Sequence, residues 1–276
     1  MKKIKIKVYV ISFIMVLLYP VFFIDFLEFS LDGFDFFQLS YMNFYHFIFI
    51  IFLIGQLYLQ LYSKINIQDH YRQLEIFIPL MNDLNIFKKL PNTRGYAASP
   101  DFLYTINQII KNEKPKTVVE AGSGVSTLIA SYSFKKYSND SRIISLDHES
   151  HYAKKTISEI SNHNLEEYAN VVHAPLKKYH DSFIWYDTSK IDSIEEIDFL
   201  IIDGPPSKGS KDARYPAMPI LFDKLSNNAI IILDDSKRKM EKDVVKKWKN
   251  DFPNQLQFKY IDNDKGLFII KKIIKK

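Results

Sequence analysis

The chain has 276 residues, of which 47% are hydrophobic, with a formal net charge of +5 and no cysteine. This length holds one large domain, or a smaller domain with an appendage, and the apolar content excludes global disorder. Without cysteine the chain has no disulfides, thiolate zinc sites or cysteine nucleophiles. Much of the positive charge lies in lysines at the two ends. Because no basic stripe interleaved with aromatic residues accompanies it, we expect no nucleic-acid partner.

Two apolar stretches open the chain. Residues 8–24 carry no charged side chain, and residues 41–62 carry none apart from the titratable His46. A membrane-spanning helix needs roughly 20 mainly apolar residues, and about 17 are enough. The sequence between the stretches contains acidic residues but neither lysine nor arginine, whereas lysines precede the first stretch and follow the second. By the positive-inside rule, residues 1–63 are expected to form a two-helix transmembrane hairpin in the cytoplasmic membrane, in contact with its lipid. Both termini and the rest of the chain then lie in the cytoplasm.

Two other interpretations of this region are a cleaved signal peptide and a pair of buried core helices. A signal peptide needs small residues after its apolar core, but Tyr19-Pro20-Val21 stands there. Buried helices of a soluble domain rarely run this long without a polar face. The hairpin is therefore favoured. Residues 64–94 are expected to be a connector, with an amphipathic helix over residues 67–84.

From residue 95 to residue 276, strand and helix patterns alternate. Expected strands cover residues 117–120, 142–147, 170–173, 197–203 and 229–234, and a hairpin signal separates residues 256–261 from residues 267–272. Expected helices cover residues 99–111, 125–134, 151–162 and 237–252. Such alternation is typical of an α/β fold. We expect a Rossmann-like, seven-stranded, mostly parallel sheet that ends in an antiparallel hairpin.

A glycine loop follows the first expected strand. It begins with Glu120 and continues through Gly122 and Gly124. Glycines at this point let the backbone turn tightly and approach a ligand, and the next helix presents its N-terminus to an anionic group. Such a loop is compatible with NAD, FAD or simple turn formation. However, Thr127 stands where the dinucleotide fingerprint has its third glycine, and Glu120 is suited to an ammonium rather than a pyrophosphate.

Further carboxylates follow the second, fourth and fifth expected strands. Asp147 suits hydrogen bonds from ribose hydroxyls, while Asp203, Asp234 and Asp235 are expected to converge at the carboxyl edge of the sheet. Together these three could hold a divalent cation such as Mg²⁺, which would lower the pKa of a bound hydroxyl. Alternatively, they cap helices or bind a cofactor without any metal.

In their order and spacing these blocks resemble the class I S-adenosylmethionine-dependent methyltransferases, over about residues 95–272. More narrowly they resemble a bacterial branch often met near surface-polysaccharide genes. The blocks that carry this narrower resemblance are Gly95-Tyr96-Ala97-Ala98-Ser99-Pro100-Asp101, Gly122-Ser123-Gly124-Val125-Ser126-Thr127, Asp203-Gly204-Pro205-Pro206, Arg214-Tyr215-Pro216-Ala217 and Leu233-Asp234-Asp235.

The resemblance implies a role for each matching position. Glu120, Gly122 and Gly124 would contact the methionine end of S-adenosylmethionine, and Asp203 would lie close to its sulfonium. The ribose and adenine would be held by Asp147, His148 and Ala174. Metal-dependent members carry acids after strands four and five and then commonly an asparagine. This chain departs from that pattern, because Asp235 stands in the asparagine position.

The implied activity is methyl transfer to oxygen of a sugar or another small or lipid-linked glycan acceptor, with Asp203 and Asp234 as catalytic residues. Trp185 and Tyr186 are candidates for an aromatic wall around the acceptor, or else belong to an ordinary packed loop. Arg214 is a candidate for binding an acidic acceptor. Lys208 and Lys211 flank Gly209 in a segment typical of a lid. A non-catalytic membrane scaffold and an NAD-dependent oxidoreductase remain as alternatives, and the oligomeric state stays open.

Overall fold

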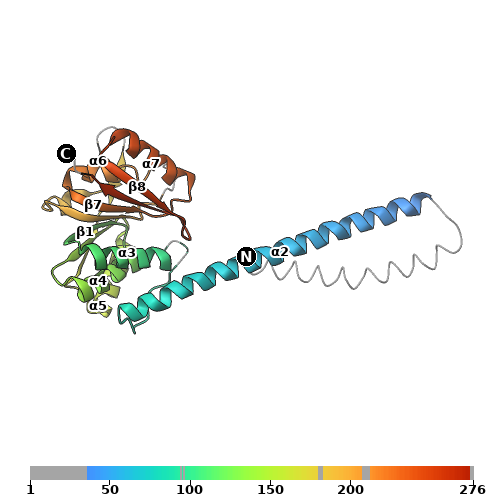
Figure 1. Ribbon diagram of the computed structural model, residues 1–276, viewed down its shortest axis with the longest axis horizontal. Helices are drawn as coiled ribbons and strands as arrows, with labels where there is room; N and C mark the ends of the chain where they lie inside the picture. Colours follow the sequence, from blue (N-terminus) through green and yellow to red (C-terminus); the bar gives the residue numbers. More distant parts are fainter. Residues whose placement is uncertain (1–35, 94, 96, 180–182, 207–211, 274–276) are drawn as a thin grey trace. The chain divides into compact units, whose positions relative to one another are not determined.

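The computed structural model describes residues 36–93, 95, 97–179, 183–206 and 212–273 (Figure 1). The chain divides into two compact units, Met1–Gln68 and Asp69–Lys276. Helix α2 (Phe36–Asp83) contributes residues to both units.

Within the first unit, the described residues belong to α2. The helical stretch His46–Asp83 is long and apolar enough to cross a membrane, with a mean hydropathy of 1.6 in its most apolar window and none of that window buried. This assessment depends on length and composition only. The first expected span, residues 8–24, lies outside the described residues, so the two-helix hairpin stays a prediction. No break separates the second span from the connector, because no proline or glycine occurs between residues 56 and 78 to interrupt the helix.

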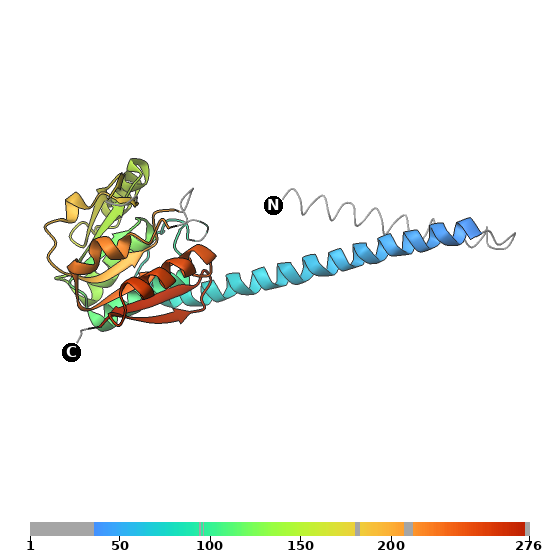
Figure 2. The same ribbon diagram turned by 90° about the horizontal axis from the view of Figure 1, so that it is seen from above.

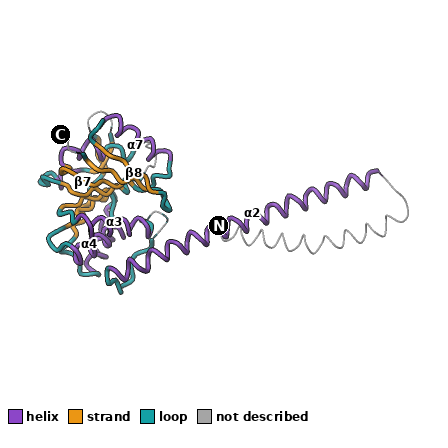
Figure 3. Tube along the Cα trace, in the orientation of Figure 1, coloured by secondary structure: helices purple, strands orange, loops and turns teal. Residues whose placement is uncertain are grey.

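The second unit is built on a seven-stranded sheet of order β3-β2-β1-β6-β7-β9-β8. Figure 3 shows the strands of this unit in orange and its helices in purple. In this sheet β3, β2, β1, β6 and β7 are parallel to one another, and β9 pairs antiparallel with both β7 and β8. This arrangement confirms the predicted fold class and its C-terminal hairpin, which Figure 2 shows in red at one edge of the sheet. The strands are β1 (Thr117–Ala121), β2 (Arg142–Asp147), β3 (Ala169–His173), β6 (Ile197–Ile202), β7 (Leu225–Leu233), β8 (Leu256–Ile261) and β9 (Leu267–Lys272).

Helices cover both faces of the sheet (Figure 1). Successive strand side chains point to opposite faces, so in β6 Phe199 and Ile201 enter one core while Leu200 and Ile202 enter the other. This explains why the central strands are apolar at nearly every position. The helices are α3 (Pro100–Glu113), α4 (Val125–Tyr137) and α5 (Ser150–Asn162) on one side, and α6 (Ala217–Leu221) and α7 (Lys239–Asp251) on the other.

The compact unit begins at Asp69, earlier than the expected domain start at residue 95. The apolar face of the expected connector supplies Leu80, Leu84 and Ile86 to the same core as Phe102 of α3. In addition, the Gln73 side chain donates a hydrogen bond of 2.9 Å to an Asp101 carboxylate oxygen. The connector therefore contributes to the core of the domain.

A second, two-stranded sheet was not expected. Strands β4 (Leu176–Lys178) and β5 (Ile184–Tyr186) pair antiparallel between β3 and β6 in the chain. Three-residue strands are too short to produce a recognisable alternation in sequence.

Candidate functional site

The carboxyl ends of β1, β2, β6 and β7 lie along one edge of the sheet. The chain proceeds from β1 toward β2 and β3 on one side and then returns to β6 and β7 on the other, so the strand order reverses between β1 and β6. Backbone hydrogen bonds continue past these ends: Gly122 N–H donates to Leu146 O at 2.9 Å, and Asp203 N–H donates to Ala121 O at 3.1 Å. Asp234 N–H likewise donates to Ile202 O at 3.1 Å. The loops after β1, β2, β6 and β7 are thereby aligned along one edge, which is where open α/β sheets bind ligands.

The glycine loop has the backbone conformation that its sequence predicts. Gly122 has φ +119°, which a residue with a side chain rarely adopts. Gly124 precedes α4, and its N–H donates to Thr127 Oγ1 at 3.1 Å. The Thr127 hydroxyl in turn donates to Glu120 Oε2 at 2.6 Å. Thr127, in the place of the third fingerprint glycine, therefore joins the loop to the acid before it.

Glu120 is fully buried at the end of β1. Its Oε2 accepts hydrogen bonds from Thr127 at 2.6 Å and from Ser145 of β2 at 2.5 Å. Its Oε1 is buried and accepts no hydrogen bond of normal geometry from the described residues, although the Ser126 hydroxyl lies near enough to lower the pKa of the carboxyl. Burial raises the pKa of this carboxyl, and hydrogen bonds from hydroxyl groups act against the rise. A buried acceptor of this kind fits a ligand that brings its own N–H donor and positive charge.

Asp147, His148 and Ala174 lie together at the ends of β2 and β3. The Asp147 carboxylate accepts from Ser123 Oγ at 2.6 Å and from the Glu149 N–H at 3.0 Å. A carboxylate accepts about four hydrogen bonds, so Asp147 keeps capacity for ribose hydroxyls. Ala174 is buried and donates its N–H to Asp147 O at 2.7 Å. The predicted cofactor residues of β1, β2 and β3 are thus gathered on one side of the reversal point.

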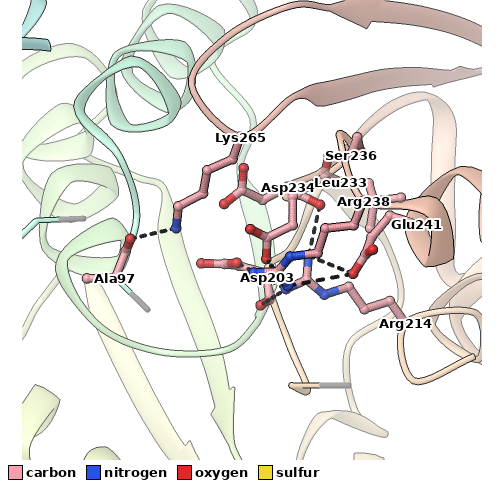
Figure 4. A network of polar contacts seen from close by, with 10 residues as sticks. Ala97, Asp203, Arg214, Leu233, Asp234, Ser236, Arg238, Glu241 and Lys265 are labelled. Atoms are coloured by element: carbon pink, nitrogen blue, oxygen red, sulfur yellow. Dashed lines mark hydrogen bonds and ion pairs between the residues drawn. The ribbon is translucent and has the colours of Figure 1, made fainter. Parts of the chain in front are cut away.

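The three acids after β6 and β7 also converge. Asp203, Asp234 and Asp235 each have a carboxylate oxygen within 4.8 Å of the others. Arg214, whose side chain is only 5% exposed, reaches into the same cluster (Figure 4). Its Nη2 donates to Asp235 Oδ2 at 2.7 Å and to Asp203 O at 2.7 Å, and its Nη1 donates to Asp234 O at 2.8 Å. Arg214 is therefore hydrogen-bonded within the protein. The expectation that it is available to bind an acidic acceptor differs from this arrangement.

Burial and mutual repulsion decide the protonation of this cluster. Burial raises the pKa of Asp203 to about 6, with Arg214 lowering it and Asp235 raising it. Burial raises the pKa of Asp234 well above its ordinary value, and the charges of Asp203 and Asp235 raise it further. Both carboxylate oxygens of Asp234 are buried without a hydrogen-bond partner in the described part of the chain. Asp203 and Asp234 therefore hold a proton more tightly than ordinary carboxyl groups do.

Lys265 and Glu241 belong to this neighbourhood, although the sequence did not single them out. Lys265 Nζ donates to Ala97 O at 2.9 Å, and its charge opposes the raised pKa values of Asp203 and Asp234 (Figure 4). It lies in the turn of the β8–β9 hairpin, which hydrogen-bonds to the loop after β7 through Gly266 O. The sequence signalled the turn, but it contains no signal for where the turn docks.

The structure buries both residues of the expected aromatic wall. Trp185 is fully buried and Tyr186 is 1% exposed, and both belong to the core cluster that includes Leu200 and Ile202 of β6. The Tyr186 hydroxyl abuts Gly204, where an added Cβ would lie 2.2 Å from it. The His148 ring packs edge-on against Tyr186, with centroids 5.9 Å apart. The expected lid around Gly209 lies outside the described residues.

The donor set does not fit a resident divalent cation. Asp235 Oδ2 already accepts from Arg214 and pairs with Arg238 Nη1 at 2.9 Å. Arg214 Nη2 also lies 3.4 Å from Asp203 Oδ1. Two of the three carboxylates are therefore paired with guanidinium groups, which repel a metal ion and use the oxygens it would need.

Comparisons with known proteins agree on the kind of domain. Residues 119–236 match the model of a family described as a methyltransferase domain. No curated protein matches the chain. An SAH-bound methyltransferase from Podospora anserina is similar in fold at 13% identity and a TM-score of 0.51, over 72% of this chain and 88% of that one. The O-methyltransferase TomG from Streptomyces achromogenes, in complex with SAM, is similar at 8% identity and a TM-score of 0.51, over 73% of this chain and 89% of that one.

The matched segment runs from β1 to just beyond β7 and so contains all four aligned strand ends. The second unit thus contains a segment that matches a methyltransferase-domain family, and it has the fold of the similar methyltransferase structures.

Proposed function

We propose that this protein transfers the methyl group of S-adenosylmethionine to an oxygen atom of a small or lipid-linked acceptor. The observation that carries the proposal is the buried Oε1 of Glu120, which accepts no hydrogen bond of normal geometry from the described chain, beside a glycine loop with a positive φ. A primary ammonium supplies the donor and the charge that this oxygen lacks. The SAM and SAH bound in similar folds support the same choice of cofactor.

The residues at the ends of β1, β2 and β3 divide the binding task. Glu120 would accept from the amino group, and the loop at Gly122 and Gly124 would let the backbone approach the methionine part. Asp147 would accept from the ribose hydroxyls, with its orientation held by Ser123 and the Glu149 N–H. His148 and Ala174 would border the adenine. When bound, S-adenosylmethionine supplies a methyl group on a positively charged sulfur.

The chain's own chemical task is to align the acceptor and remove one proton. An acceptor hydroxyl forms a bond to the methyl carbon while the carbon–sulfur bond breaks and sulfur keeps the electron pair. The hydroxyl proton must pass to a base, and a carboxylate with a raised pKa is a better base than an ordinary one. Asp203, whose pKa is raised to about 6 and whose side chain is partly exposed, meets this requirement at the end of β6, and Asp234 lies buried behind it at the end of β7.

Calorimetric titration of the full-length protein in detergent with S-adenosylmethionine, and in parallel with NAD, tests the proposal. We expect binding of S-adenosylmethionine alone, lost in Asp147→Ala and kept in Asp140→Ala, which removes an exposed carboxylate outside the site. Binding of NAD instead would favour the oxidoreductase alternative. Binding of neither would favour a non-catalytic scaffold with a methyltransferase fold.

We further propose that the protein is anchored in the cytoplasmic membrane by two spans and acts on a lipid-linked glycan. Support comes from the apolar, unburied stretch of α2 and from the lysines that flank the expected spans. Full activity on a soluble acceptor, unchanged after removal of residues 1–63, would contradict this proposal.

The absence of cysteine makes the topology directly testable. A membrane-impermeant maleimide should label Ser30→Cys, in the expected outer loop, in intact cells. It should label Ser189→Cys, an exposed position in the second unit, only after permeabilisation. The opposite pattern would place the domain outside.

A further inference from the structure

We propose that the Arg214 guanidinium takes the place of a divalent cation among Asp203, Asp234 and Asp235, so that this protein binds no divalent metal there while Arg214 is present. The inference rests on the proposed function for the meaning of the cluster in catalysis. Its test does not, because metal binding is measured without cofactor or acceptor.

The contacts of Arg214 are those of a bridging cation. One nitrogen, Nη2, lies 2.7 Å from Asp235 Oδ2 and 3.4 Å from Asp203 Oδ1, so it joins carboxylates from two different strand ends. The same guanidinium donates to the backbone carbonyls of Asp203 and Asp234 at 2.7 Å and 2.8 Å. Oxygen atoms from two loops thus converge on one positive group, as they would on a metal ion.

The surroundings of Arg214 hold it there. Its side chain is 5% exposed, and Glu241, itself 3% exposed, lies 4.0 Å from Nη1. A guanidinium is not deprotonated in proteins, so this buried position needs carboxylates on several sides. Arg238 contacts Asp235 from the rim, with its side chain 47% exposed. Arg214 is therefore the interior cation of the cluster, and Arg238 lies outside it.

The arrangement separates the roles of the three acids. Asp235 and Asp203 are paired with Arg214, whereas the two carboxylate oxygens of Asp234 contact no hydrogen-bond donor among the described residues. A metal ion would draw all three acids into its coordination shell. With a guanidinium in its place, Asp234 is left as the one acid of the three that no guanidinium pairs with. Arg214 is then a positioning residue, which fastens the β6 and β7 ends and neutralises the neighbours of Asp234.

Binding of Mn²⁺ to the full-length protein, followed by electron paramagnetic resonance and by calorimetry, tests the proposal. We expect no binding at this site in the wild type and none in Arg238→Met. Arg214→Met, which removes the interior cation but keeps an unbranched apolar stem, should bind Mn²⁺ with a Kd at least tenfold below the highest Mn²⁺ concentration at which the wild type shows no binding. The added Asp235→Asn change should abolish that gain, because it removes a ligand.

Two results would overturn the proposal. One is Mn²⁺ binding by the wild-type protein that disappears in Asp235→Asn. The other is a folded Arg214→Met protein, judged by circular dichroism, that gains no Mn²⁺ binding. If Arg214→Met folds poorly, the same expectation becomes a rise in its Tm on addition of Mn²⁺, since a ligand that binds the folded state stabilises it. A normal S-adenosylmethionine titration alongside a failed metal result would leave the proposed function intact.

Discussion

The site has two halves, one at the ends of β1 and β2 and the other at the ends of β6 and β7, and they surround their acidic side chains with different kinds of groups. At the ends of β1 and β2, Glu120 and Asp147 accept hydrogen bonds from neutral groups, namely the hydroxyls of Ser123, Thr127 and Ser145 and one backbone N–H. At the ends of β6 and β7, the charged side chains of Arg214, Arg238 and Lys265 surround the acids instead.

This difference separates binding a cation from moving a proton. Neutral donors leave the negative charge of a carboxylate uncompensated, so it can still attract an ammonium from a ligand. Guanidinium and ammonium groups already compensate the charge of their carboxylates, and the acid left over in a crowded, buried cluster acquires a raised pKa. Substitutions in the first half should therefore change cofactor affinity, whereas substitutions in the second half should change stability and its pH dependence.

The largest effect, on cofactor affinity, is expected when Glu120 at the end of β1 loses its negative charge. Glu120→Gln should weaken S-adenosylmethionine binding by about 10- to 100-fold, because hydrogen bonds to charged groups contribute roughly 1.5–3 kcal/mol. Thermal stability should not fall, since burial disfavours the charged form of this acid. Calorimetric titration and a melting curve measure the two quantities. Unchanged affinity would show that Glu120 does not meet the cofactor's ammonium.

The boundary between the halves is expected to be sterically tight. In Gly204→Ala, the new Cβ would lie 2.2 Å from the Tyr186 hydroxyl and 3.2 Å from Ala121 O, which should cost about 1–3 kcal/mol of unfolding free energy. Combining it with Tyr186→Phe should recover part of the loss. Gly55→Ala is the control, since its Cβ would meet no heavy atom within 4 Å in the described chain. Denaturant unfolding of the single and double variants measures this coupling.

In the charged half, removing an acid should stabilise the protein. A carboxyl with a raised pKa contributes stability that is present below its unfolded pKa and is lost as pH rises through the folded pKa. Asp234→Asn should therefore melt at a higher temperature than the wild type at pH 8, with about 2–4 °C for each kcal/mol gained. The difference should shrink toward pH 4. A lower Tm at pH 8 would mean that a cation already compensates Asp234.

The pH dependence of the wild type should report on Asp203. Because its folded pKa is raised to about 6 from an ordinary 3.8, its contribution to stability should decline as pH rises from about 4 through about 6. Melting curves across this range should lose that component in Asp203→Asn. An identical pH profile in the variant would assign the decline to another group.

The smallest effect is expected for an exposed pair outside both halves. Lys177 Nζ lies 2.5 Å from Asp187 Oδ1, but the two side chains are 44% and 34% exposed. Lys177→Met should change the unfolding free energy by less than about 1 kcal/mol, since solvent screens such pairs. A larger loss of unfolding free energy would indicate that exposed ion pairs contribute more to the stability of this protein than solvent screening allows.

The sequence by itself determined the strand pattern, the glycine loop and the positions of the acids. These features are local: alternating burial needs apolar residues in runs, and a turn at Gly122 needs a residue free to adopt φ +119°. Within residues 95–276, the limits of the expected helices and strands fall within four residues of those observed, whereas the helix expected over residues 67–84 is the end of the much longer α2. Because the carboxyl ends of parallel strands share an edge, the convergence of Glu120, Asp147, Asp203 and Asp234 also followed from the sequence.

Only the tertiary structure decided which partners these acids have. Arg214 could be read from sequence as a substrate-binding residue, because nothing near it in the chain reveals that it turns inward between β6 and β7. Lys265 comes to the site through the docking of a hairpin turn, and Leu80 joins the core through the packing of α2. Trp185 is buried in the same core cluster as Leu200 and Ile202 of β6. Each of these contacts joins segments distant in sequence, and their geometry arises only when the chain closes its core.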